Sequence, residues 1–475
     1  MITFSEIIRA LSSAKVSGGD FPITEAVIDS RNVIPGAIFF ALEGETVDGH
    51  QFVQQAFEKG AAAAIISKDL PDFGGKIIDM RLATRETHIT VSSENPFCIR
   101  VENTLEALQT LAAWWRRALP VRVIGITGSV GKSSTKELTA EVLSYRFSTA
   151  KNPGNYNNEI GLPLTILNVG NGIEKLVLEM GFYYPGEITF LCGLSKPEIG
   201  VVTNIGTVHA ERAGSQEAIA AGKSELVTAL PESPHGTAIL NYDDPLVRKM
   251  ADKTKAKIIF YGLDPHADVW ADEITGLGLQ GVQFKLHHHQ DAIMLTVPLL
   301  GRHSVQTILR AAAVAIIEGM SLKEISEALS QTNSQLRLVA VKTKSGALIL
   351  DDTYNATPES TIAALELLSE LHGQKIAVLG DMLELGEYEE IGHMKVGEKA
   401  ATIVNHLITV GEKGKIIAET AKKHGLPSLA ITCVSDAIAA AELLRYNLHK
   451  NDVVLVKGSH GLRMDRISTI LEASV

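Results

Sequence analysis

The sequence predicts an α/β protein built around a mostly parallel central sheet. Short apolar runs alternate along the chain with amphipathic helical patterns, an order typical of parallel strands covered by helices. In the last third of the chain, each apolar run is soon followed by Gly, Asp or Ser, as at the carboxyl ends of parallel strands. One apolar run also leads through a glycine-rich turn into a helical pattern. The 475 residues are enough for about two to four domains.

The N-terminal segment, residues 1–99, has the composition of a small α/β domain. We predict strands at Ala37–Ala41 and Ala62–Ile66, with a helix at Phe52–Lys59 between them. The stretch after Asp69 is rich in Pro, Gly and Asp, which favours loops. We place the domain boundary at Glu94–Arg100.

The central segment, residues 100–331, starts with an amphipathic helix at Thr104–Ala118 that ends before Pro120. The run VRVIGITG then predicts a buried strand and a turn. Residues Val269–Val297 are typical of hairpins, and the alanine-rich Gly301–Met320 of a helix. Further buried strands are predicted at Lys175–Leu178, Ile199–Val202, Ala238–Asn241 and Lys257–Tyr261.

The C-terminal segment, residues 332–475, repeats the alternation of apolar runs and helical patterns. It therefore predicts another α/β domain. The strand candidates are Ala347–Leu350, Lys375–Leu379, His406–Val410 and Asp452–Val456.

Composition and charge exclude several classes of protein. The net charge is −11 and no Lys/Arg block occurs, so we expect no nucleic-acid partner. Glu6 and Arg9 interrupt the N-terminal apolar residues, which argues against a signal peptide, and no apolar run is long enough for a membrane span. The three cysteines are far apart, as in a reducing compartment. We expect a cytoplasmic monomer.

The strongest local motif is the turn TGSVGKSS after the first central strand, followed by a helical pattern at Lys136–Ser144. Glycines let the backbone wrap around a polyphosphate, and exposed N–H groups at a helix start favour anions. Lys132 would neutralise the β- and γ-phosphates, and Ser133 would bind Mg²⁺. Ile126 stands where longer loops of this kind have a first glycine, so a turn without a ligand is the alternative. The predicted phosphate loop is Thr127, Gly128, Ser129, Val130, Gly131, Lys132, Ser133 and Ser134.

Two candidate metal ligands lie just after predicted buried strands. Glu179 and His209 each follow an apolar run, so a parallel sheet would bring them towards the phosphate loop. Taken singly, each is more typical of an ordinary surface or loop residue. Lys223 is typical of a helix surface; with a lowered pKa it could instead capture CO₂ as a carbamate. The run His287–His289 would alternate between strand faces, which favours a solvated hairpin over a metal site.

Four blocks of residues resemble the Mur ligases over nearly the whole chain. The central block joins the phosphate loop to NYNNEIG, residues 155–161, and this NxNNxIG signature is similar to that of members that add D-alanyl-D-alanine. The N-terminal block comprises Asp29–Arg31, Pro35–Gly36, Gly44–Glu45 and Asp48–His50. The C-terminal blocks are Asp351–Ala356 with Pro358, Gly380–Gly386, and Val456–Ser459.

The resemblance implies a three-domain ligase. The N-terminal domain would bind the UDP part of a UDP-muramoyl tripeptide, the central domain ATP with two Mg²⁺ ions, and the Rossmann-like C-terminal domain would close over the site. The peptide carboxylate would attack the ATP γ-phosphate to give an acyl phosphate and ADP. The amine of D-alanyl-D-alanine would then form the amide, and closure would exclude water.

The resemblance also implies a set of residue roles. Catalytic roles fall on Lys132, Lys223 and His209. ATP contacts beyond the loop fall on His303, Arg337 and Asp352. Metal ligands would be Ser133, Glu179, His209 and carbamylated Lys223. Substrate contacts fall on Ser30, Arg31, Thr46, Asp48, Gly49, His50, Asn155, Asn157, Asn158, Tyr354, Asn355 and the closing Lys457.

Three stretches depart from the family pattern. Ser304 and Thr307 replace two asparagines near the adenine position, after the retained His303. Tyr183 and Tyr184 change the loop after Glu179, near the peptide substrate. His460 stands where many members have arginine.

Three alternative functions fit the sequence less well. A ligase that adds another amine, such as a diamino acid, is disfavoured by the NNxIG block. A catalytically silent nucleotide-binding scaffold is disfavoured because Lys132, Glu179, His209 and Lys223 are all present. A GTPase or kinase would leave the flanking domains unexplained, and the sequence has no NKxD guanine motif.

Overall fold

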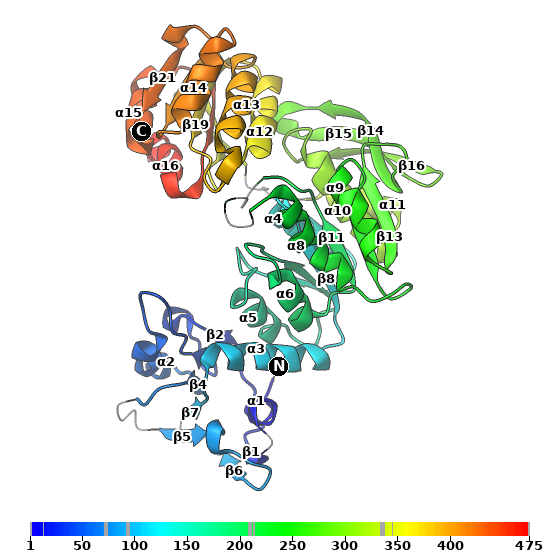
Figure 1. Cartoon of the computed structure of the whole chain (residues 1–475), viewed down its shortest axis with the longest axis vertical. Coiled ribbons are helices and arrows are strands. Elements are labelled where there is room, and N and C mark those ends of the chain that lie inside the picture. The colour runs from blue at the N-terminus through cyan, green and yellow to red at the C-terminus, as the bar shows by residue number, and fades with distance from the viewer. Residues whose placement is uncertain are drawn as a thin grey trace. The chain divides into compact units, whose positions relative to one another are not determined.

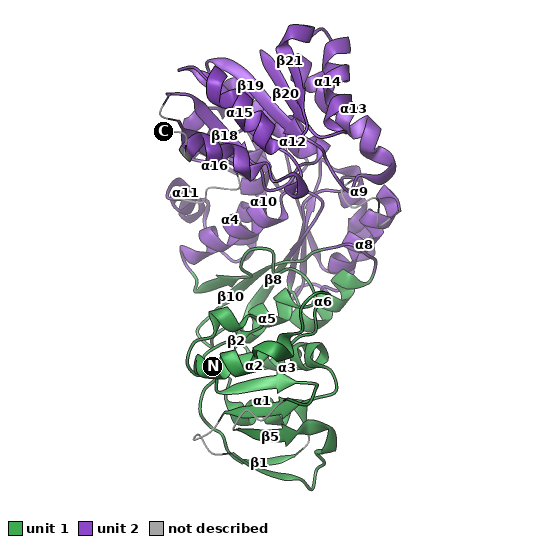
Figure 2. Cartoon of the chain, turned by 90° about the vertical axis from the view of Figure 1, so that its left-hand side faces the viewer, with its two compact units in different colours: residues 1–125, 147–181, 186–198 green, residues 126–146, 182–185, 199–475 purple. Residues whose placement is uncertain are grey.

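A computed structural model of the chain describes residues 2–12, 14–70, 75–91, 96–207, 211, 214–332, 338–343 and 345–473. The chain divides into two compact units (Figure 2). Unit 1 comprises residues 1–125, 147–181 and 186–198, and unit 2 comprises residues 126–146, 182–185 and 199–475. The predicted α/β class is confirmed: strands and helices alternate through both units (Figure 1).

Unit 1 contains a parallel five-stranded sheet of order β2-β3-β4-β7-β5. The central strand β4 is buried along its whole length, as expected of a strand covered on both faces. Helices α1 (Phe4–Leu11) and α2 (Val53–Glu58) belong to this part. The strands are β2 (Ala26–Val27), β3 (Ile38–Phe40), β4 (Ala63–Ile66), β5 (Lys76–Asp79) and β7 (Phe97–Arg100).

The prediction of loops after Asp69 is wrong. That stretch contains β5 and β6 (His88–Val91); β5 pairs with β7, and β6 pairs with β1 (Lys15–Gly18). Each strand is only four residues long, too short to show a clear periodicity between Pro, Gly and Asp residues. Pairing with distant strands, which local sequence does not reveal, stabilises them.

A nine-stranded sheet has the order β16-β15-β14-β13-β12-β11-β8-β10-β9. Pairings from β11 to β14 are parallel, whereas β14, β15 and β16 form the predicted antiparallel hairpins. The strands are β8 (Arg122–Thr127), β9 (Thr149–Lys151), β10 (Lys175–Glu179), β11 (Ile199–Val202), β12 (Thr237–Asn241), β13 (Lys257–Gly262), β14 (Val269–Gly276), β15 (Val282–His288) and β16 (Asp291–Val297).

The histidine run lies at the hairpin between β15 and β16, as predicted, but it is less solvated than predicted. The ring of His287 stacks on Trp270 with centroids 3.8 Å apart, and its Nε2 lies 2.8 Å from Asp272 Oδ1. His287 is therefore half-buried by packing on the neighbouring strand.

The central segment contributes three helices to unit 1: α3 (Thr104–Ala118), α5 (Gly161–Leu167) and α6 (Glu187–Ser195). Asn103 caps α3 by accepting hydrogen bonds from the N–H groups of Leu105 and Glu106. The buried Arg116 donates from Nε to the carbonyl of Ser195 over 2.7 Å, which joins α3 to the end of α6. The helices that the central segment contributes to unit 2 are α4 (Lys132–Ser144), α8 (Gln216–Thr228), α9 (Pro245–Arg248), α10 (Ser304–Ile317) and α11 (Leu322–Ser330).

The last part of unit 2 is a six-stranded sheet of order β17-β18-β22-β19-β20-β21, parallel except at β17. Two apolar clusters lie among its strands and helices. The strands are β17 (Val339–Lys342), β18 (Leu348–Asp352), β19 (Gln374–Gly380), β20 (His406–Val410), β21 (Ile431–Val434) and β22 (Asp452–Lys457). The helices are α12 (Pro358–Glu370), α13 (Glu389–Ala401), α14 (Gly414–Lys423), α15 (Ala437–Asn447) and α16 (Asp465–Ala473).

Within the described part of the chain, no helix has the length and apolar character that crossing a membrane requires.

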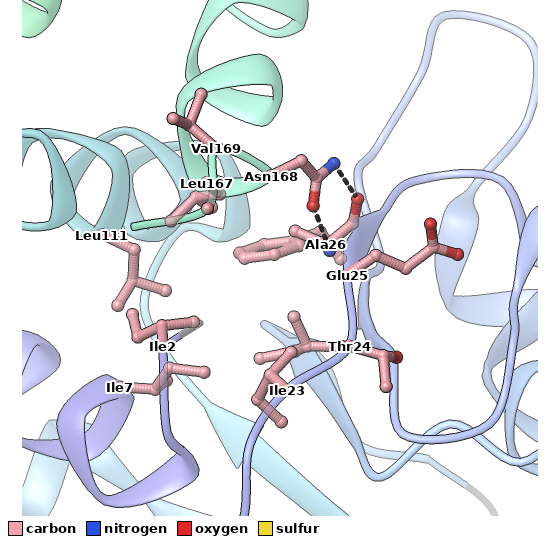
Figure 3. A pocket seen from close by; sticks show the side chains of 13 residues that line it. Ile2, Ile7, Ile23, Thr24, Glu25, Ala26, Leu111, Leu167, Asn168 and Val169 are labelled. Atoms are coloured by element: carbon pink, nitrogen blue, oxygen red, sulfur yellow. Dashed lines mark hydrogen bonds between the residues drawn. The ribbon is translucent and has the colours of Figure 1, made fainter. Parts of the chain in front are cut away.

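The side chain of Asn168 satisfies backbone groups on the free edge of strand β2. Asn168, at the end of α5, accepts from the Ala26 N–H over 2.7 Å and donates to the Ala26 carbonyl over 3.0 Å. Its amide thus replaces a missing strand neighbour and satisfies two backbone groups. Beside it lies a cavity of about 40 Å³, into which apolar side chains such as Ile2, Ile23 and Leu111 project (Figure 3).

We predict that Asn168→Ala loosens β2, because two buried backbone groups lose their partner. Local opening should become easier by about 1–3 kcal/mol, measured as faster hydrogen exchange of the Ala26 amide. Asn171→Ala, in the exposed turn that follows, is the control and should not change that rate. Unchanged Ala26 exchange in Asn168→Ala would show that the amide does not hold this edge.

Candidate active site

The phosphate loop joins β8, which ends at Thr127, to α4, which begins at Lys132. Gly128 and Gly131 have φ angles of 147° and 82°, conformations that favour glycine. The prediction that the helix begins at Lys136 is wrong by one turn. Gly131, as the left-handed N-cap, starts the helix earlier, where the polar residues of the first turn show no apolar periodicity. The backbone N–H groups of the first turn of α4 therefore directly follow the glycine turn, where they can bind an anion together with the loop.

Residues after β11 hold the loop in this conformation. Thr203 donates from Oγ1 to the Val130 carbonyl over 2.7 Å, and Asn204 Oδ1 accepts from the Val130 N–H over 2.8 Å. The Gly206 N–H donates to Ser129 Oγ over 2.9 Å. Thr203 and Asn204 were not predicted as site residues; their position at the carboxyl end of a buried strand is the signal that could have found them.

Two lysines meet at one backbone oxygen of the loop. Lys132 Nζ donates to the Gly128 carbonyl over 2.9 Å, and Lys223 Nζ donates to the same oxygen over 3.0 Å. Both side chains bring a cationic or potentially cationic amine to the glycine turn. An arrangement of this kind attracts a polyanion.

Lys223 is buried, contrary to the typical exposure of a lysine on a helix. It is 1% exposed, and its Nζ lies 4.8 Å from the centre of the Phe182 ring. Burial, and secondly the charge of Lys132, hold the pKa of the Lys223 amine well below its usual range. This shift favours the uncharged amine, which is the form that capture of CO₂ requires.

Glu179 ends β10 in unit 1 and is 3% exposed. Asn157 Nδ2 donates to its Oε1 over 2.9 Å, which fixes the direction of the carboxylate. Asn152 accepts from the Glu179 N–H over 2.9 Å and donates to its carbonyl over 3.1 Å. The NxNNxIG block thus surrounds the end of β10. Asn152 was not predicted, because it precedes the signature.

The other two asparagines of the block differ in role. Asn158 Oδ1 accepts from the Gly161 N–H over 2.9 Å, at the start of α5. Asn155 is exposed. Within this block, Asn158 therefore supports the backbone, whereas the side chain of Asn155 is accessible to a ligand.

The substrate residues predicted in the N-terminal segment follow the carboxyl ends of β2 and β3, where parallel sheets bind ligands. Ser30 is buried and donates to Gln55 over 2.6 Å, whereas Arg31 is exposed and pairs with Asp29. Thr46 lies in an exposed bend, and Gly49 begins a short 3₁₀ turn.

Asp48 and His50 form a fixed pair in the same segment. His50 Nδ1 lies 2.6 Å from Asp48 Oδ1, and its Nε2 accepts from the Ser67 N–H over 2.9 Å. Hydrogen bonds from Lys68, and then from the His50 N–H and ring, hold the pKa of Asp48 far below its usual range. The carboxylate therefore remains charged at neutral pH and keeps the ring in one orientation.

The C-terminal residues gather at the ends of β18 and β22. Lys457 is 2% exposed and donates to Asp352 Oδ2 over 2.6 Å and to the Asn355 carbonyl over 2.9 Å. Tyr354 is 46% exposed. The His303 side chain is exposed at its edge; desolvation by the surrounding residues lowers its pKa, and the charge of Asp352 opposes this. His209 and Arg337 lie outside the described residues.

The geometry of the loop fits a nucleotide with Mg²⁺. No group of three His, Cys, Asp or Glu side chains among the described residues could hold a metal ion by itself. A Mg²⁺ ion that accompanies a nucleotide does not need such a group, because phosphate oxygens and waters supply most of its ligands. Ser133, the residue that the motif predicts as a Mg²⁺ ligand, lies in the first turn of α4 directly after Lys132.

Comparison with known proteins agrees with this geometry. Residues 22–116 match the model described as "Mur ligase family, catalytic domain", residues 126–315 the Mur ligase middle domain, and residues 336–460 the Mur ligase glutamate ligase domain. The chain belongs to the Mur ligase family, as the sequence motifs predict.

Individual relatives are similar over nearly their whole length. The UDP-N-acetylmuramoyl-tripeptide–D-alanyl-D-alanine ligase of Bacillus subtilis is 35% identical over 92% of this chain and 91% of its own. The ligase of the same name from Escherichia coli is 32% identical over 99% and 98%. The crystal structure of MurF from Acinetobacter baumannii has a TM-score of 0.82 at 28% identity and covers 99% of both chains. MurF ligase from Thermotoga maritima, in complex with ADP, has a TM-score of 0.78 at 28% identity, with 95% and 98% covered.

We predict that Gly128→Ala abolishes nucleotide binding. A Cβ atom at this position would lie 1.8 Å from Thr203 Oγ1, so the loop or its support must move. Isothermal calorimetry with ADP and Mg²⁺ measures the effect. Gly172→Ala is the control, since its Cβ would meet nothing within 4 Å. Wild-type affinity in Gly128→Ala would show that the nucleotide does not depend on this turn.

Proposed function

We propose that the chain is an ATP-dependent ligase that adds D-alanyl-D-alanine to a UDP-N-acetylmuramoyl-tripeptide in peptidoglycan precursor synthesis. The observation that carries this proposal is the similarity to relatives of that name at 32–35% identity over more than nine-tenths of both chains. The phosphate loop and its two lysines supply the chemistry that such a ligase needs. ATP and Mg²⁺ would be used in the cytoplasm, where precursor nucleotides are made.

Two alternatives are less well supported. A ligase for 2,6-diaminopimelate shares the fold at 19% identity with a TM-score of 0.53, against 0.82 for the D-alanyl-D-alanine type. A silent scaffold would not need an amine buried at the phosphate loop, as Lys223 is. Burying a lysine without a carboxylate partner is costly, and lysines with strongly shifted pKa values cluster at functional sites.

The three segments take the roles expected of the family. Residues 1–99 would bind the UDP part through Ser30, Arg31 and the Thr46–His50 turn. Residues 100–331 would bind ATP. Residues 332–475 would close over it, with Asp352, Tyr354, Asn355 and Lys457 facing the substrates. The matches at 22–116, 126–315 and 336–460 support this division.

In the first step, an oxygen of the peptide carboxylate attacks the γ-phosphorus of ATP, and the bond to the β-phosphate oxygen breaks. The products are an acyl phosphate and ADP. Loop N–H groups and Lys132 hold the β- and γ-phosphates and offset the charge on the leaving oxygen. Bound Mg²⁺ would draw charge from the phosphate oxygens, and Ser133, Glu179, His209 and a carbamate on Lys223 would hold it.

In the second step, the amine of D-alanyl-D-alanine attacks the acyl carbonyl. The bond to the phosphate oxygen breaks, the amine loses a proton, and an amide and phosphate result. Asn157 keeps Glu179 in place throughout by its hydrogen bond to Oε1. An acyl phosphate reacts readily with water, so the site must exclude water until the amine arrives.

We predict that ADP release requires both the UDP-muramoyl tripeptide and D-alanyl-D-alanine, measured with each substrate omitted in turn. Lys132→Ala should lower kcat by about 10²–10³-fold, since one charged donor to the transferred phosphoryl group is lost. Lys249→Ala, at an exposed lysine of the same unit, is the control. Equal ADP release with water in place of the amine would contradict the ligase assignment.

We also predict that activity depends on CO₂, because burial lowers the pKa of the Lys223 amine and so favours the uncharged form that reacts with CO₂. Enzyme dialysed into CO₂-free buffer should lose turnover and recover it when bicarbonate is added. Lys223→Gln should be inactive with or without bicarbonate. Full activity of the wild type without CO₂, together with retained activity of Lys223→Gln, would exclude the carbamate.

A further inference from the structure

Arg310 is a buried arginine beside the phosphate loop for which neither the motifs nor the proposed mechanism has a role. It lies on α10, which packs against α4, the helix that follows the loop (Figure 1). The residue is 6% exposed. A buried guanidinium is uncommon unless something nearby compensates its charge.

One side of the guanidinium supports the end of the loop. Arg310 Nη1 donates to Thr135 Oγ1 over 2.9 Å, and that hydroxyl donates in turn to the Gly131 carbonyl over 2.7 Å. A Cβ atom on Gly131 would lie 2.8 Å from Arg310 Nη1. The charge is therefore placed directly against the loop backbone, at the residue that precedes Lys132.

The other side supports the strand end that holds the loop. Arg310 Nε donates to the Tyr261 hydroxyl over 3.0 Å, and that hydroxyl donates to the Thr203 carbonyl over 2.8 Å. Burial raises the pKa of Tyr261 to about 12, so the phenol stays protonated. Thr203 itself holds Val130. One guanidinium thus connects both supports of the phosphate loop.

The charge of Arg310 has no carboxylate partner among the described residues; its hydrogen-bond partners there are the hydroxyls of Thr135 and Tyr261. Arginine stays protonated at all relevant pH values. Desolvation of a guanidinium without an anion is costly. An anion bound in the loop would remove this cost.

We infer that Arg310 is a positioning residue of the phosphate loop, and that the polyphosphate of a bound nucleotide compensates its buried charge. The inference rests on the proposed nucleotide site. In this account α10 supports the nucleotide site in two ways: it packs against α4, and its Arg310 supplies a positive charge. Arg310 should therefore stabilise the nucleotide-bound protein more than it stabilises the free protein.

The test compares Arg310→Met, which keeps the bulk and removes the charge, with Arg310→Lys, which keeps the charge. Arg248→Met, at an exposed arginine of α9, is the control. Calorimetry measures the Kd of ADP with Mg²⁺, and thermal unfolding with and without ADP measures the stabilisation that binding provides. Arg310→Met should weaken ADP binding about 10–100-fold, Arg310→Lys should recover part of this loss, and Arg248→Met should behave like the wild type.

A merely structural role predicts a different pattern. Arg310→Met would then lower the unfolding temperature of the free protein and leave the ADP-induced rise intact. We expect the reverse: the ADP-induced rise shrinks, the KM for ATP increases, and the KM for the UDP-substrate does not change. The salt dependence of ADP binding should also become weaker, because one positive charge has been removed.

Thr135→Val provides a second variant should Arg310→Met fail to fold. It removes the hydroxyl between Arg310 and Gly131, with Thr135→Ser as its matched control. We expect weaker ADP binding in Thr135→Val and near wild-type binding in Thr135→Ser. Wild-type ADP affinity in Arg310→Met or in Thr135→Val would overturn the inference and leave the nucleotide site standing. If the wild-type protein itself binds no ADP, both the proposed function and the inference fail.

Discussion

The carbonyl oxygen of Gly128 accepts hydrogen bonds from Lys132 and from Lys223, and the chemistry of the site depends on this shared contact. Two amines within hydrogen-bond reach of one oxygen cannot both remain charged without a cost. One solution is a neutral Lys223, as burial favours; another is an anion that enters the loop. The same arrangement therefore supports both proposals, the polyphosphate site and the reaction of Lys223 with CO₂.

The loop can keep this shape because several layers of hydrogen bonds surround it. Thr203 and Asn204 hold Val130 from the end of β11, and the Tyr261 hydroxyl and Asn241 amide both donate to the Thr203 carbonyl. Arg310 links this layer to the first turn of α4. Rigid support of this kind lets backbone N–H groups act on a phosphoryl group without reorganisation. In unit 1, Asn152 and Asn157 provide a comparable support for Glu179.

Local sequence predicted what depends on local chemistry. The glycine turn, the buried strands of the nine-stranded sheet and the position of Glu179 at a strand end follow from apolar runs and turn residues. Burial of Lys223 did not follow, because α8 shows no clear apolar face and tertiary packing alone decides its exposure. The strands β5 and β6 were missed because their stability comes from distant partners. Arg310 was missed because an arginine in an apolar helix has no motif; its role depends on which helix lies next to it.

The position of a bound nucleotide tests the central claim most directly. A crystal structure with a non-hydrolysable ATP analogue and Mg²⁺ should show β- and γ-phosphate oxygens accepting from the N–H groups of the glycine turn. Lys132 should then have moved from the Gly128 carbonyl to a phosphate oxygen. A nucleotide bound elsewhere, or a bound nucleotide with Lys132 still on that carbonyl, would contradict the account.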